Sequence, residues 1–497
     1  MKLSTPFATL ATLALAGSAA AFPAFVGKGE AGIAELLARA ESADPEFYAR
    51  AKAADEAAFQ AFRERSAEIR KGGEVYKKRA DGKRSITALI DPASFKFNDA
   101  EQTVDLTSDE HKFIAPGPND IRGPCPGLNL LANHGYLDRS GVTTLTQGID
   151  AIVKVFGVGL DLAAALNAYA VLFNGNLLDL TWSIGGPYGS KGLGGVTNLL
   201  FGQPQGINAH NIYEGDASIV RQDYYEPGAN NDNVLLKLDL FKELLADGGN
   251  NSADGVDVFT PEVMLKHKSR RWHQSVERNP LFFNSAFGGL VVTTAAERFV
   301  AEFAANNTAD PETGANRIYL DEKNLFAFFS VERKADGELV YTPGHERLLP
   351  SWKRRPLGSP FSLVDIVITL LNAGRIDPSL LSVGGNAGKV NSFAGVDAGN
   401  LSGGVFNTAQ LLEDPQALSC FLYQATVTEL IPTQVQTLYK ITGAALDFVG
   451  KTLAPAWGKL KGGDGDEPCQ SFNTNAAGRV SVADAYKKFP GSKGALV

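Results

Sequence analysis

The chain has 497 residues, with 47 Lys and Arg against 55 Asp and Glu, which gives a net charge of −8. A hydrophobic fraction of 44% with 21% charged residues is typical of a globular protein and excludes an intrinsically disordered chain. The acidic balance and the shortness of the basic clusters also exclude a nucleic-acid-binding groove, because such a groove needs an extended positive field.

The first 21 residues have the layout of a secretory signal peptide. Lys2 precedes a mostly apolar run over residues 7–16, and small residues fill positions 17–21 before Phe22. The apolar run is too short to span a membrane, so we expect a secreted protein without a membrane segment. Three N-x-S/T sequons agree with secretion, and they predict glycosylation at Asn250, Asn306 and Asn400.

Residues 22–95 form a predicted N-terminal extension. Apolar residues recur at helical spacing at positions 47, 51, 54, 58 and 62, which predicts one or two amphipathic helices between residues 30 and 71. A basic stretch follows, with the pairs Lys78-Arg79 and Lys83-Arg84. These pairs are either processing sites, which would make the extension a propeptide, or parts of a solvated linker.

The remainder, residues 96–497, is expected to form a single all-α domain. Apolar residues at i, i+3 and i+4 spacing dominate, whereas alternating runs typical of strands are short and scattered. The predicted helices cover residues 141–173, 233–246, 261–278, 293–305, 360–372 and 418–453.

The most informative segment is the run RGPCPGLNLLANHGY at residues 122–136. Pro126 suits the first position of a helix and Gly135 suits its end, so Cys125 is expected at the helix N-cap. Free backbone N–H groups there would lower the pKa of the thiol and favour a thiolate. Such a thiolate can be a nucleophile, a metal ligand or a haem ligand; zinc is disfavoured because the next cysteine is far away in the chain.

This segment resembles the proximal motif of the fungal haem-thiolate peroxidases, the family of chloroperoxidase and the unspecific peroxygenases. The resemblance extends from about residue 97 to the C-terminus. It implies haem b as the cofactor, with Cys125 as the axial ligand of its iron. Electron donation from such a thiolate favours cleavage of a peroxide O–O bond. It also implies hydrogen peroxide as the oxidant and a small organic molecule or a halide as the substrate.

A second run, HNIYEGDASIVR at residues 210–221, is similar to the segment that holds a divalent cation beside a haem propionate in longer members of the family. The resemblance implies that the Glu214 carboxylate, the Gly215 carbonyl and the Ser218 hydroxyl bind Mg²⁺, since hard oxygen ligands suit a hard ion. It further implies a disulfide between Cys420 and Cys469, which leaves Cys125 free.

Acid–base catalysis is expected from Glu297. The family uses a glutamate to move a proton at the bound peroxide, and its longer members add an arginine seven residues earlier. Glu297 is the only carboxylate between Asn279 and position 297, but Leu290 stands where the arginine would be. The missing arginine motivates an alternative, a secreted haem-binding protein with a degenerate distal site and little peroxide chemistry.

Two segments close to Glu297 have interpretations of their own. Phe282, Phe283 and Phe287 either line an apolar access channel or belong to the core. The basic run from Lys266 to Arg271, with His273 beyond it, is expected to lie on a solvated surface.

Overall fold

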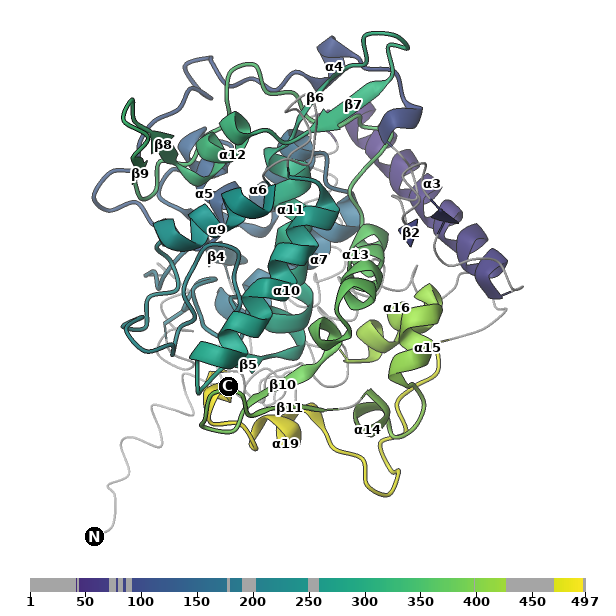
Figure 1. The fold of residues 1–497 in the computed structure, drawn as a ribbon. Coiled ribbons are helices and arrows are strands. Elements are labelled where there is room, and N and C mark those ends of the chain that lie inside the picture. Colours follow the sequence, from purple (N-terminus) through teal and green to yellow (C-terminus); the bar gives the residue numbers. More distant parts are fainter. Residues whose placement is uncertain are drawn as a thin grey trace, which may run out of the picture.

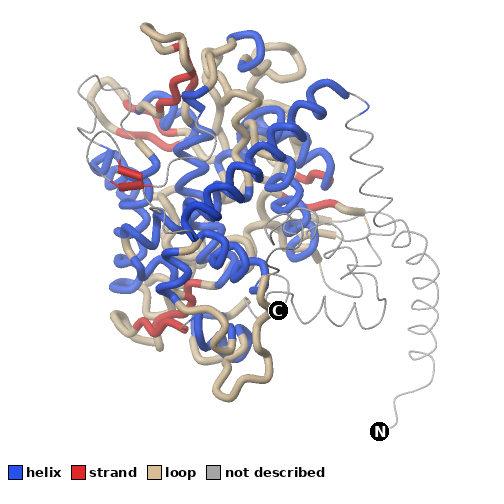
Figure 2. The backbone as a smooth tube through the Cα atoms, turned by 90° about the vertical axis from the view of Figure 1, so that its right-hand side faces the viewer, coloured by secondary structure: helices blue, strands red, loops and turns tan. Residues whose placement is uncertain are grey.

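Helices are the predominant regular structure of the described part of the chain, and the strands are short and scattered around them (Figures 1 and 2). The computed structural model describes residues 42, 44–70, 77–78, 84–85, 92–176, 179–189, 203–248, 259–396, 398–425 and 469–494. The predicted signal peptide, the sequon at Asn250 and most of the helix predicted for residues 418–453 lie outside these residues. Among them, no helix combines the length and the apolar character that crossing a membrane requires.

The helices are distributed over the whole described chain. Their bounds are α3 (Pro45–Arg70), α4 (Asp99–Gln102), α5 (Pro126–Asn133), α6 (Leu145–Phe156), α7 (Leu160–Asn174), α9 (Leu238–Gly248), α10 (Pro261–Arg278), α11 (Thr294–Phe299), α12 (Glu322–Phe329), α13 (Leu363–Ile376), α14 (Ala398–Ser402), α15 (Thr408–Glu413), α16 (Pro415–Gln424) and α19 (Val482–Tyr486).

Small antiparallel sheets make the all-α expectation too narrow. Strands of two to four residues are too short to give a detectable alternation, which is why the sequence pattern did not predict them. The pairs are β1 (Lys77–Lys78) with β2 (Arg84–Ser85), β3 (Val142–Thr144) with β4 (Thr181–Ser183), β6 (Asn306–Ala309) with β7 (Asn316–Tyr319), and β8 (Val331–Arg333) with β9 (Leu339–Tyr341); β5 (Phe283–Asn284), β10 (Val383–Asn386) and β11 (Phe393–Val396) form one sheet in the order β11-β10-β5.

Local capping residues explain where two predicted helices begin and end. Residues 261–278 form α10 with the predicted bounds, because Thr260 accepts a hydrogen bond from the Val263 N–H and Pro261 occupies the first helical position. The helix predicted for residues 141–173 is instead divided into α6 and α7. Gly157, in the left-handed conformation, ends α6.

The extension contributes one helix that packs on the main body. Helix α3 lies along one side of the molecule (Figure 1), in contact with α7 and α13. Phe59 and Phe62 join the main hydrophobic core, and the Tyr48 hydroxyl donates a hydrogen bond to Asp150 at 2.6 Å. The amphipathic helix predicted in this region is therefore confirmed for residues 45–70.

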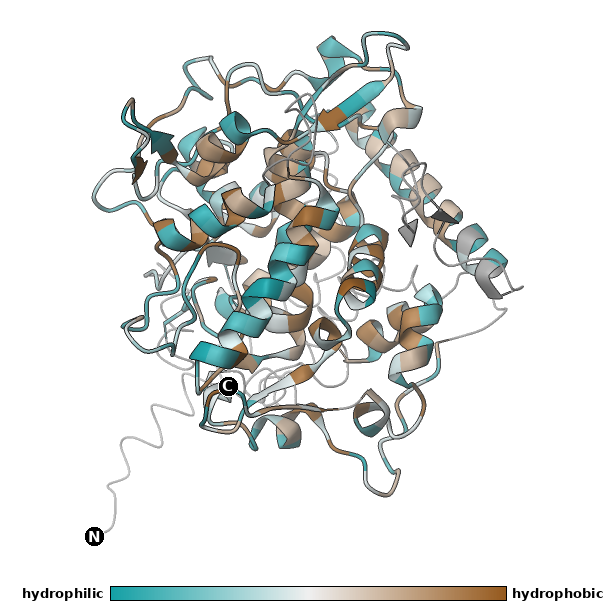
Figure 3. Cartoon of the chain, viewed as in Figure 1, coloured by the Kyte–Doolittle hydropathy of each residue, from teal (hydrophilic) through white to brown (hydrophobic). Residues whose placement is uncertain are grey.

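The main apolar cluster extends from α3 to α19 and includes residues from most helices between them. Helix α10 crosses the front of the molecule with a largely hydrophilic side turned to the viewer (Figure 3). Its other side is buried through Met264 and Trp272, and it packs against α9, α11 and α13. This packing positions α10 directly behind one wall of the functional site.

Candidate active site

A large apolar cavity lies between α5, α7, α12 and the helical segment at residues 286–304. Its empty space, including the part open to solvent, is about 1640 Å³. Its apolar and aromatic lining, drawn from several helices, suits a large planar cofactor together with a substrate. The aromatic side chains that line it are Phe156, Tyr169, Trp182, Tyr213, Phe287, Phe299, Phe303, Phe328 and Phe329.

Cys125 forms part of one wall of this cavity. It occupies the N-cap of α5 in an extended conformation, Pro126 is the first helical residue, and Gly135 adopts a positive φ after the helix end, as predicted. The preceding loop requires Gly123, since a Cβ there would lie 1.9 Å from the carbonyl oxygen of Ile184. The half-buried thiol lines the cavity and is the free cysteine of the described residues.

The protonation of Cys125 differs from the expectation. Burial raises the pKa of the thiol, while the N–H groups of Leu128 and Gly127 and the charge of Arg221 oppose this effect. The prediction of a lowered pKa is therefore wrong for the protein without a bound metal, because an apolar cavity penalises the thiolate more than one helix N-terminus favours it. Coordination to a metal ion would supply the missing stabilisation of the thiolate.

Two asparagines of the same segment hold the cysteine loop in place. Asn129 Nδ2 donates to the carbonyl of Gly123 and to Glu346 Oε1, both at 3.0 Å, and the Gly123 N–H donates to Asn129 Oδ1 at 2.9 Å. Asn133 Nδ2 donates to the carbonyls of Gly344 and Glu346, both at 2.8 Å. The sequence motif contains these asparagines without indicating a role, and the structure shows that they clamp the loop of Cys125 to a distant segment.

The segment predicted to bind Mg²⁺ also reaches the cavity. Glu214, Gly215 and Ser218 all line it. One oxygen of the carboxylate, Glu214 Oε2, accepts hydrogen bonds from His210 Nδ1 and Asn233 Nδ2, both at 2.7 Å. Among the described residues, no three His, Cys, Asp or Glu side chains are grouped as metal ligands. For a cation, the segment thus offers neutral oxygens and one carboxylate, of which one oxygen already accepts two hydrogen bonds.

A buried arginine accompanies this segment. Arg221 lines the cavity, and its Nε donates to the carbonyl of Val234 at 2.7 Å. It is 4% exposed, so its charge lies beside the cavity and not in bulk water. The motif at residues 210–221 ends at Arg221 but does not by itself indicate a role for it. A cationic side chain in an otherwise apolar cavity is suited to bind an anionic group of a ligand.

A continuous helical segment forms another wall. It consists of the π-helix η2 (Ala286–Thr293), α11 and the π-helix η3 (Val300–Ala304). Short π-helical turns are frequent at functional sites. Phe287 lines the cavity here, as the interpretation of an apolar channel predicts. Phe282 and Phe283 are buried outside the cavity and belong to the core. Other residues of this wall are Val291, Val292, Thr293, Ala295, Ala296, Phe299, Val300 and Phe303.

Glu297 lies in this helical segment but is not among the residues that line the cavity. Its side chain is fully buried, and its charged neighbours are His267, Lys268 and Arg271 on α10 and Asp247 on α9. Burial raises the pKa of Glu297 to about 7, although these positive charges lower it. Among the described residues, both carboxylate oxygens lack a hydrogen-bond partner. Glu297 is therefore adjacent to the wall and faces away from the cavity.

The position of the missing arginine also lies outside the cavity. Leu290 is buried in the main core and lines a separate apolar pocket together with Leu370 and Leu418. An arginine at this position would therefore not reach the cavity directly. In the family an arginine stands seven residues before the glutamate. The same spacing does not place residue 290 at the cavity here, because η2 is π-helical and orients its side chains differently from an α-helix.

Lys268 provides a polar link from α10 to the cavity. Its Nζ donates to Thr293 Oγ1 at 2.6 Å and to the carbonyl of Ala217 at 2.9 Å. Thr293 lines the cavity, and its hydroxyl donates to the carbonyl of Gly289 at 2.5 Å. Burial lowers the pKa of Lys268 to about 8, although the charge of Glu297 raises it. The sequence pattern did not predict a place for Lys268 in the site.

The expectation of a solvated basic surface is wrong for half of that run. His267, Lys268 and Arg271 are at most 2% exposed, whereas the side chains of Lys266 and Arg270 are 57% and 41% exposed. The helical period explains the division, because Lys268 lies four residues after Met264 and four before Trp272 on the buried side of α10. Those two apolar residues were the signal that could have revealed the buried lysine.

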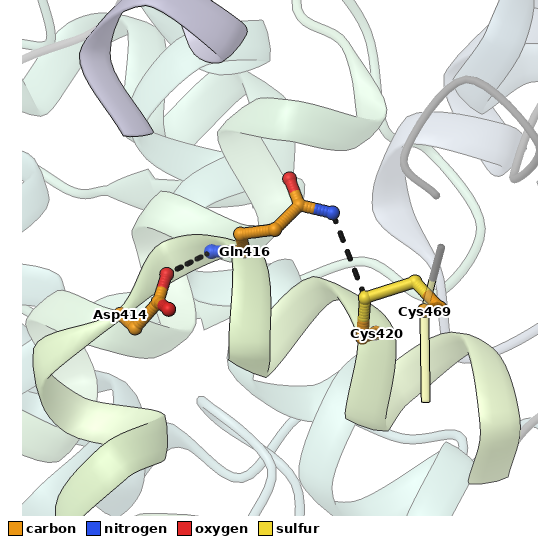
Figure 4. The surroundings of a disulfide bond; sticks show 4 residues. All are labelled: Asp414, Gln416, Cys420 and Cys469. Atoms are coloured by element: carbon orange, nitrogen blue, oxygen red, sulfur yellow. Dashed lines mark hydrogen bonds between the residues drawn. A yellow bond between two sulfur atoms is a disulfide. The ribbon is translucent and has the colours of Figure 1, made fainter. Parts of the chain in front are cut away.

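The predicted disulfide between Cys420 and Cys469 is present, with a Cα–Cα distance of 5.3 Å. Figure 4 shows it at α16, where Gln416 Nε2 contacts Cys420 Sγ at 3.5 Å and the Gln416 N–H donates to Asp414. Neither cysteine lines the cavity. The bond therefore fastens the C-terminal segment to α16, away from the functional site.

The two described sequons differ in accessibility. Asn400 is exposed in α14. Asn306 is 8% exposed, its Nδ2 donates to the Tyr319 hydroxyl at 3.0 Å, and its Oδ1 accepts from the Lys353 N–H at 2.7 Å. A glycan on Asn306 would require these contacts to open, so Asn400 is the better acceptor of the two.

An apolar aromatic cavity with a cysteine at a helix N-terminus is compatible with a haem-thiolate site. Comparison with known sequences agrees, since residues 111–357 match the model of the family described as "Peroxidase, family 2". The aromatic peroxidase fscJ of Fusarium equiseti is 35% identical over 404 residues, which cover 80% of this chain and 87% of that protein.

Two further relatives come from other fungi. The dothistromin biosynthesis peroxidase dotB of Dothistroma septosporum is 38% identical over 331 residues, which cover 66% of this chain and 74% of the relative. An aromatic peroxygenase of Cyclocybe aegerita is 32% identical over 362 residues, covering 70% and 81%. The chain therefore belongs to the fungal haem-thiolate peroxidase family and is an oxidoreductase that acts on peroxide.

Proposed function

We propose that this protein is a secreted peroxidase or peroxygenase that uses hydrogen peroxide to oxidise a small organic molecule or a halide, with haem b bound in the cavity through Cys125. The observation that carries the proposal is the position of Cys125, whose thiol opens into the apolar cavity from the N-cap of α5. The residues present fit the group, because a free cysteine, a buried arginine and a large aromatic lining surround one space.

The bound haem would supply the redox centre that cleaves the peroxide O–O bond, aided by electron donation from the thiolate. The chain itself positions the ligand: Asn129 and Asn133 fix the loop that carries Cys125, and the N–H groups of Gly127 and Leu128 stabilise negative charge on the sulfur. Arg221 places a positive charge at the cavity for an anionic group such as a propionate.

The lining of the cavity favours an aromatic or aliphatic organic substrate over a halide. Phe156, Phe299 and Phe303 stack or lie within contact of one another along the wall, and rings of this kind bind apolar molecules and exclude water. Relatives named aromatic peroxidase and aromatic peroxygenase support the same preference.

Mg²⁺, secretion and glycosylation complete the proposal. Glu214, Gly215 and Ser218 would hold Mg²⁺ at the edge of the cavity through one carboxylate and two neutral oxygens. The hydrogen bonds of His210 and Asn233 to Glu214 are present without the ion, so they compete with it for one oxygen. Secretion rests on the signal-peptide pattern, and Asn400 is the preferred glycan acceptor.

A second candidate function is a haem-binding protein with little peroxide chemistry. It is favoured by one observation, that Glu297 does not line the cavity. In the leading proposal Glu297 contributes to acid–base chemistry from behind the helical wall, through the charges of α10. The two candidates share haem ligation by Cys125 and differ in turnover.

One experiment separates these possibilities. The wild-type protein loaded with haem should oxidise a phenolic dye with hydrogen peroxide, and Cys125→Ala should fall to the background rate of free haem while its circular dichroism stays helical. Thiolate-bound haem without dye turnover would select the second candidate. Wild-type turnover by Cys125→Ala would refute both.

A further inference from the structure

One polar contact of the cavity wall has no part in the function as described so far. Thr293, at the junction of η2 and α11, is the hydroxyl-bearing residue among the Phe, Val and Ala residues of this segment that line the cavity. Lys268 donates to this hydroxyl oxygen from the far side at 2.6 Å. An ammonium group 1% exposed is costly to bury, so its placement behind a cavity hydroxyl calls for a physical reason beyond packing.

The ammonium group of Lys268 donates two hydrogen bonds among the described residues, which leaves a third N–H for proton transfer. Its ammonium group has three N–H donors, of which two bind Thr293 and the carbonyl of Ala217 among the described residues. Glu297 is the opposite charge that acts most strongly on Lys268, and it forms no direct ion pair with it. The carboxylate stands one helical turn after Thr293 on the same helical segment.

We propose that Thr293 delivers the proton for peroxide cleavage into the cavity, that Lys268 reloads Thr293, and that Glu297 is the buried counter-charge that keeps Lys268 protonated; this inference rests on the proposed function. Thr293 is then the catalytic group that touches the peroxide. Lys268 and Glu297 are positioning residues that act through it.

The proton movements balance. The Thr293 hydroxyl donates its proton to the outer oxygen of hydrogen peroxide while it accepts one from Lys268 Nζ. Once protonated, the outer oxygen can leave as water when the O–O bond breaks, and the haem of the proposed function would supply the two electrons. The proton of the inner peroxide oxygen returns through Thr293 to Lys268, so the relay ends as it began.

This sequence requires the Thr293 hydroxyl to exchange one hydrogen-bond partner. In the resting arrangement the Thr293 hydroxyl donates to the carbonyl of Gly289, and Lys268 holds its oxygen from the other side. A rotation about the Cβ–Oγ bond redirects the proton toward the cavity, because hydroxyl hydrogens rotate readily. Burial also lowers the pKa of Lys268 to about 8, which makes it a better acid near neutral pH than an exposed lysine.

Other charged groups surround the pair. Lys268 is influenced by Glu297, Asp223 and Asp216, which raise its pKa, and by Arg271, which lowers it. Glu297 is influenced by His267, Lys268 and Arg271, which lower its pKa, and by Asp247, which raises it. The relay is therefore expected to respond to pH through the whole cluster between α9, α10 and α11.

The test compares two neighbouring threonines. Thr293→Val removes the cavity hydroxyl with little change in shape. Thr294→Val is the matched control, because Thr294 is 1% exposed, lies outside the cavity lining and has a hydroxyl without a partner among the described residues. Thr293→Ser keeps the hydroxyl. Lys268→Met breaks the relay at its second member, with the exposed Lys266→Met as its control.

Two measurements are made on haem-loaded protein with an intact ferrous–CO spectrum. The first is the rate of the haem absorbance change after mixing with hydrogen peroxide, which Thr293→Val and Lys268→Met should lower by about 100-fold, since acid–base catalysis contributes about 10²–10⁴-fold. The second is the affinity for cyanide as a function of pH. Loss of the cavity donor should weaken cyanide binding about tenfold in Thr293→Val.

The outcomes decide the proposal. Thr293→Ser should stay within a few-fold of wild type, and Thr294→Val and Lys266→Met should not change. Equal behaviour of Thr293→Val and Thr294→Val in both measurements would overturn it. If Thr293→Val does not fold, Lys268→Met decides in the same way. A wild-type protein without thiolate-bound haem or peroxide reaction would refute the proposed function instead, so the two failures are distinguishable.

Discussion

The two walls of the cavity are built in contrasting ways. The wall around Cys125 comes from one contiguous segment, in which residues 122–136 supply the cysteine, the helix start and the asparagines that fix the loop. The wall at residues 286–304 supplies mainly apolar side chains, and its polar character comes from α10 behind it, through Lys268.

This contrast separates two kinds of functional site. The chemistry of a contiguous segment depends on local capping and short loops, so it is encoded by neighbouring residues. The chemistry of the helical wall depends on how α10 and α11 pack, so no single stretch of sequence contains it. The following substitutions test how each wall depends on the residues around it. The first removes the disulfide, which belongs to neither wall and serves as a reference.

Removal of the disulfide should have the largest effect on stability and leave both walls intact. The double variant Cys420→Ser with Cys469→Ser opens a loop of 49 residues, which corresponds to about 4 kcal/mol in the chain-entropy model. Denaturant unfolding should show this loss, while the ferrous–CO spectrum stays unchanged. A changed spectrum would mean that the C-terminal segment supports a wall of the cavity.

Asn129→Ala should lower the free energy of unfolding by about 3 kcal/mol, because it removes contacts that hold the Cys125 wall. The substitution leaves the N–H and carbonyl of Gly123 and one contact of Glu346 without partners in a buried position, and each such group costs about 1–3 kcal/mol. Denaturant unfolding measures the loss, with exposed Asn475→Ala as the control. Equal stability of the two variants would show that the clamp contributes nothing.

Glu297→Gln should have the smallest effect, confined to a pH window. The folded-state pKa of about 7 exceeds the ordinary value of 4.5, so the native state binds more protons between these values and its stability falls as pH rises from 4.5 to 7. The neutral glutamine removes this fall, which amounts to at most about 3 kcal/mol. Thermal unfolding across this pH range should give a shallower slope for the variant than for the wild type.

The control for this slope is Glu312→Gln, since Glu312 is exposed. Its slope should match that of the wild type. A Glu297→Gln slope that also matches the wild type would show that the pKa of Glu297 is not raised in the folded state.

The sequence predicted the parts of the fold that depend on local signals. Thr260 and Pro261 defined the start of α10, and the pair Cys125 and Pro126 defined the start of α5. The short strands were not predicted because two to four residues carry no periodicity. The break at Gly157 was missed because the apolar pattern continues across it.

The candidate site divides along the same line. Cys125, Glu214, Gly215 and Ser218 all line the cavity as the motifs suggested. The link between Lys268 and Thr293 joins residues on different helices, and its charged member lies in a run that reads as hydrophilic. The apolar residues Met264 and Trp272, four residues before and after Lys268, are the sequence signal that the lysine lies on the buried side of α10.

The ferrous–CO spectrum tests the central claim most directly, that Cys125 binds the haem iron as a thiolate. Haem-loaded wild-type protein, reduced and exposed to carbon monoxide, should show the red-shifted Soret band of thiolate ligation, and Cys125→Ala should lose it. An unshifted band in the folded wild type, or the same shifted band in Cys125→Ala, would contradict the claim.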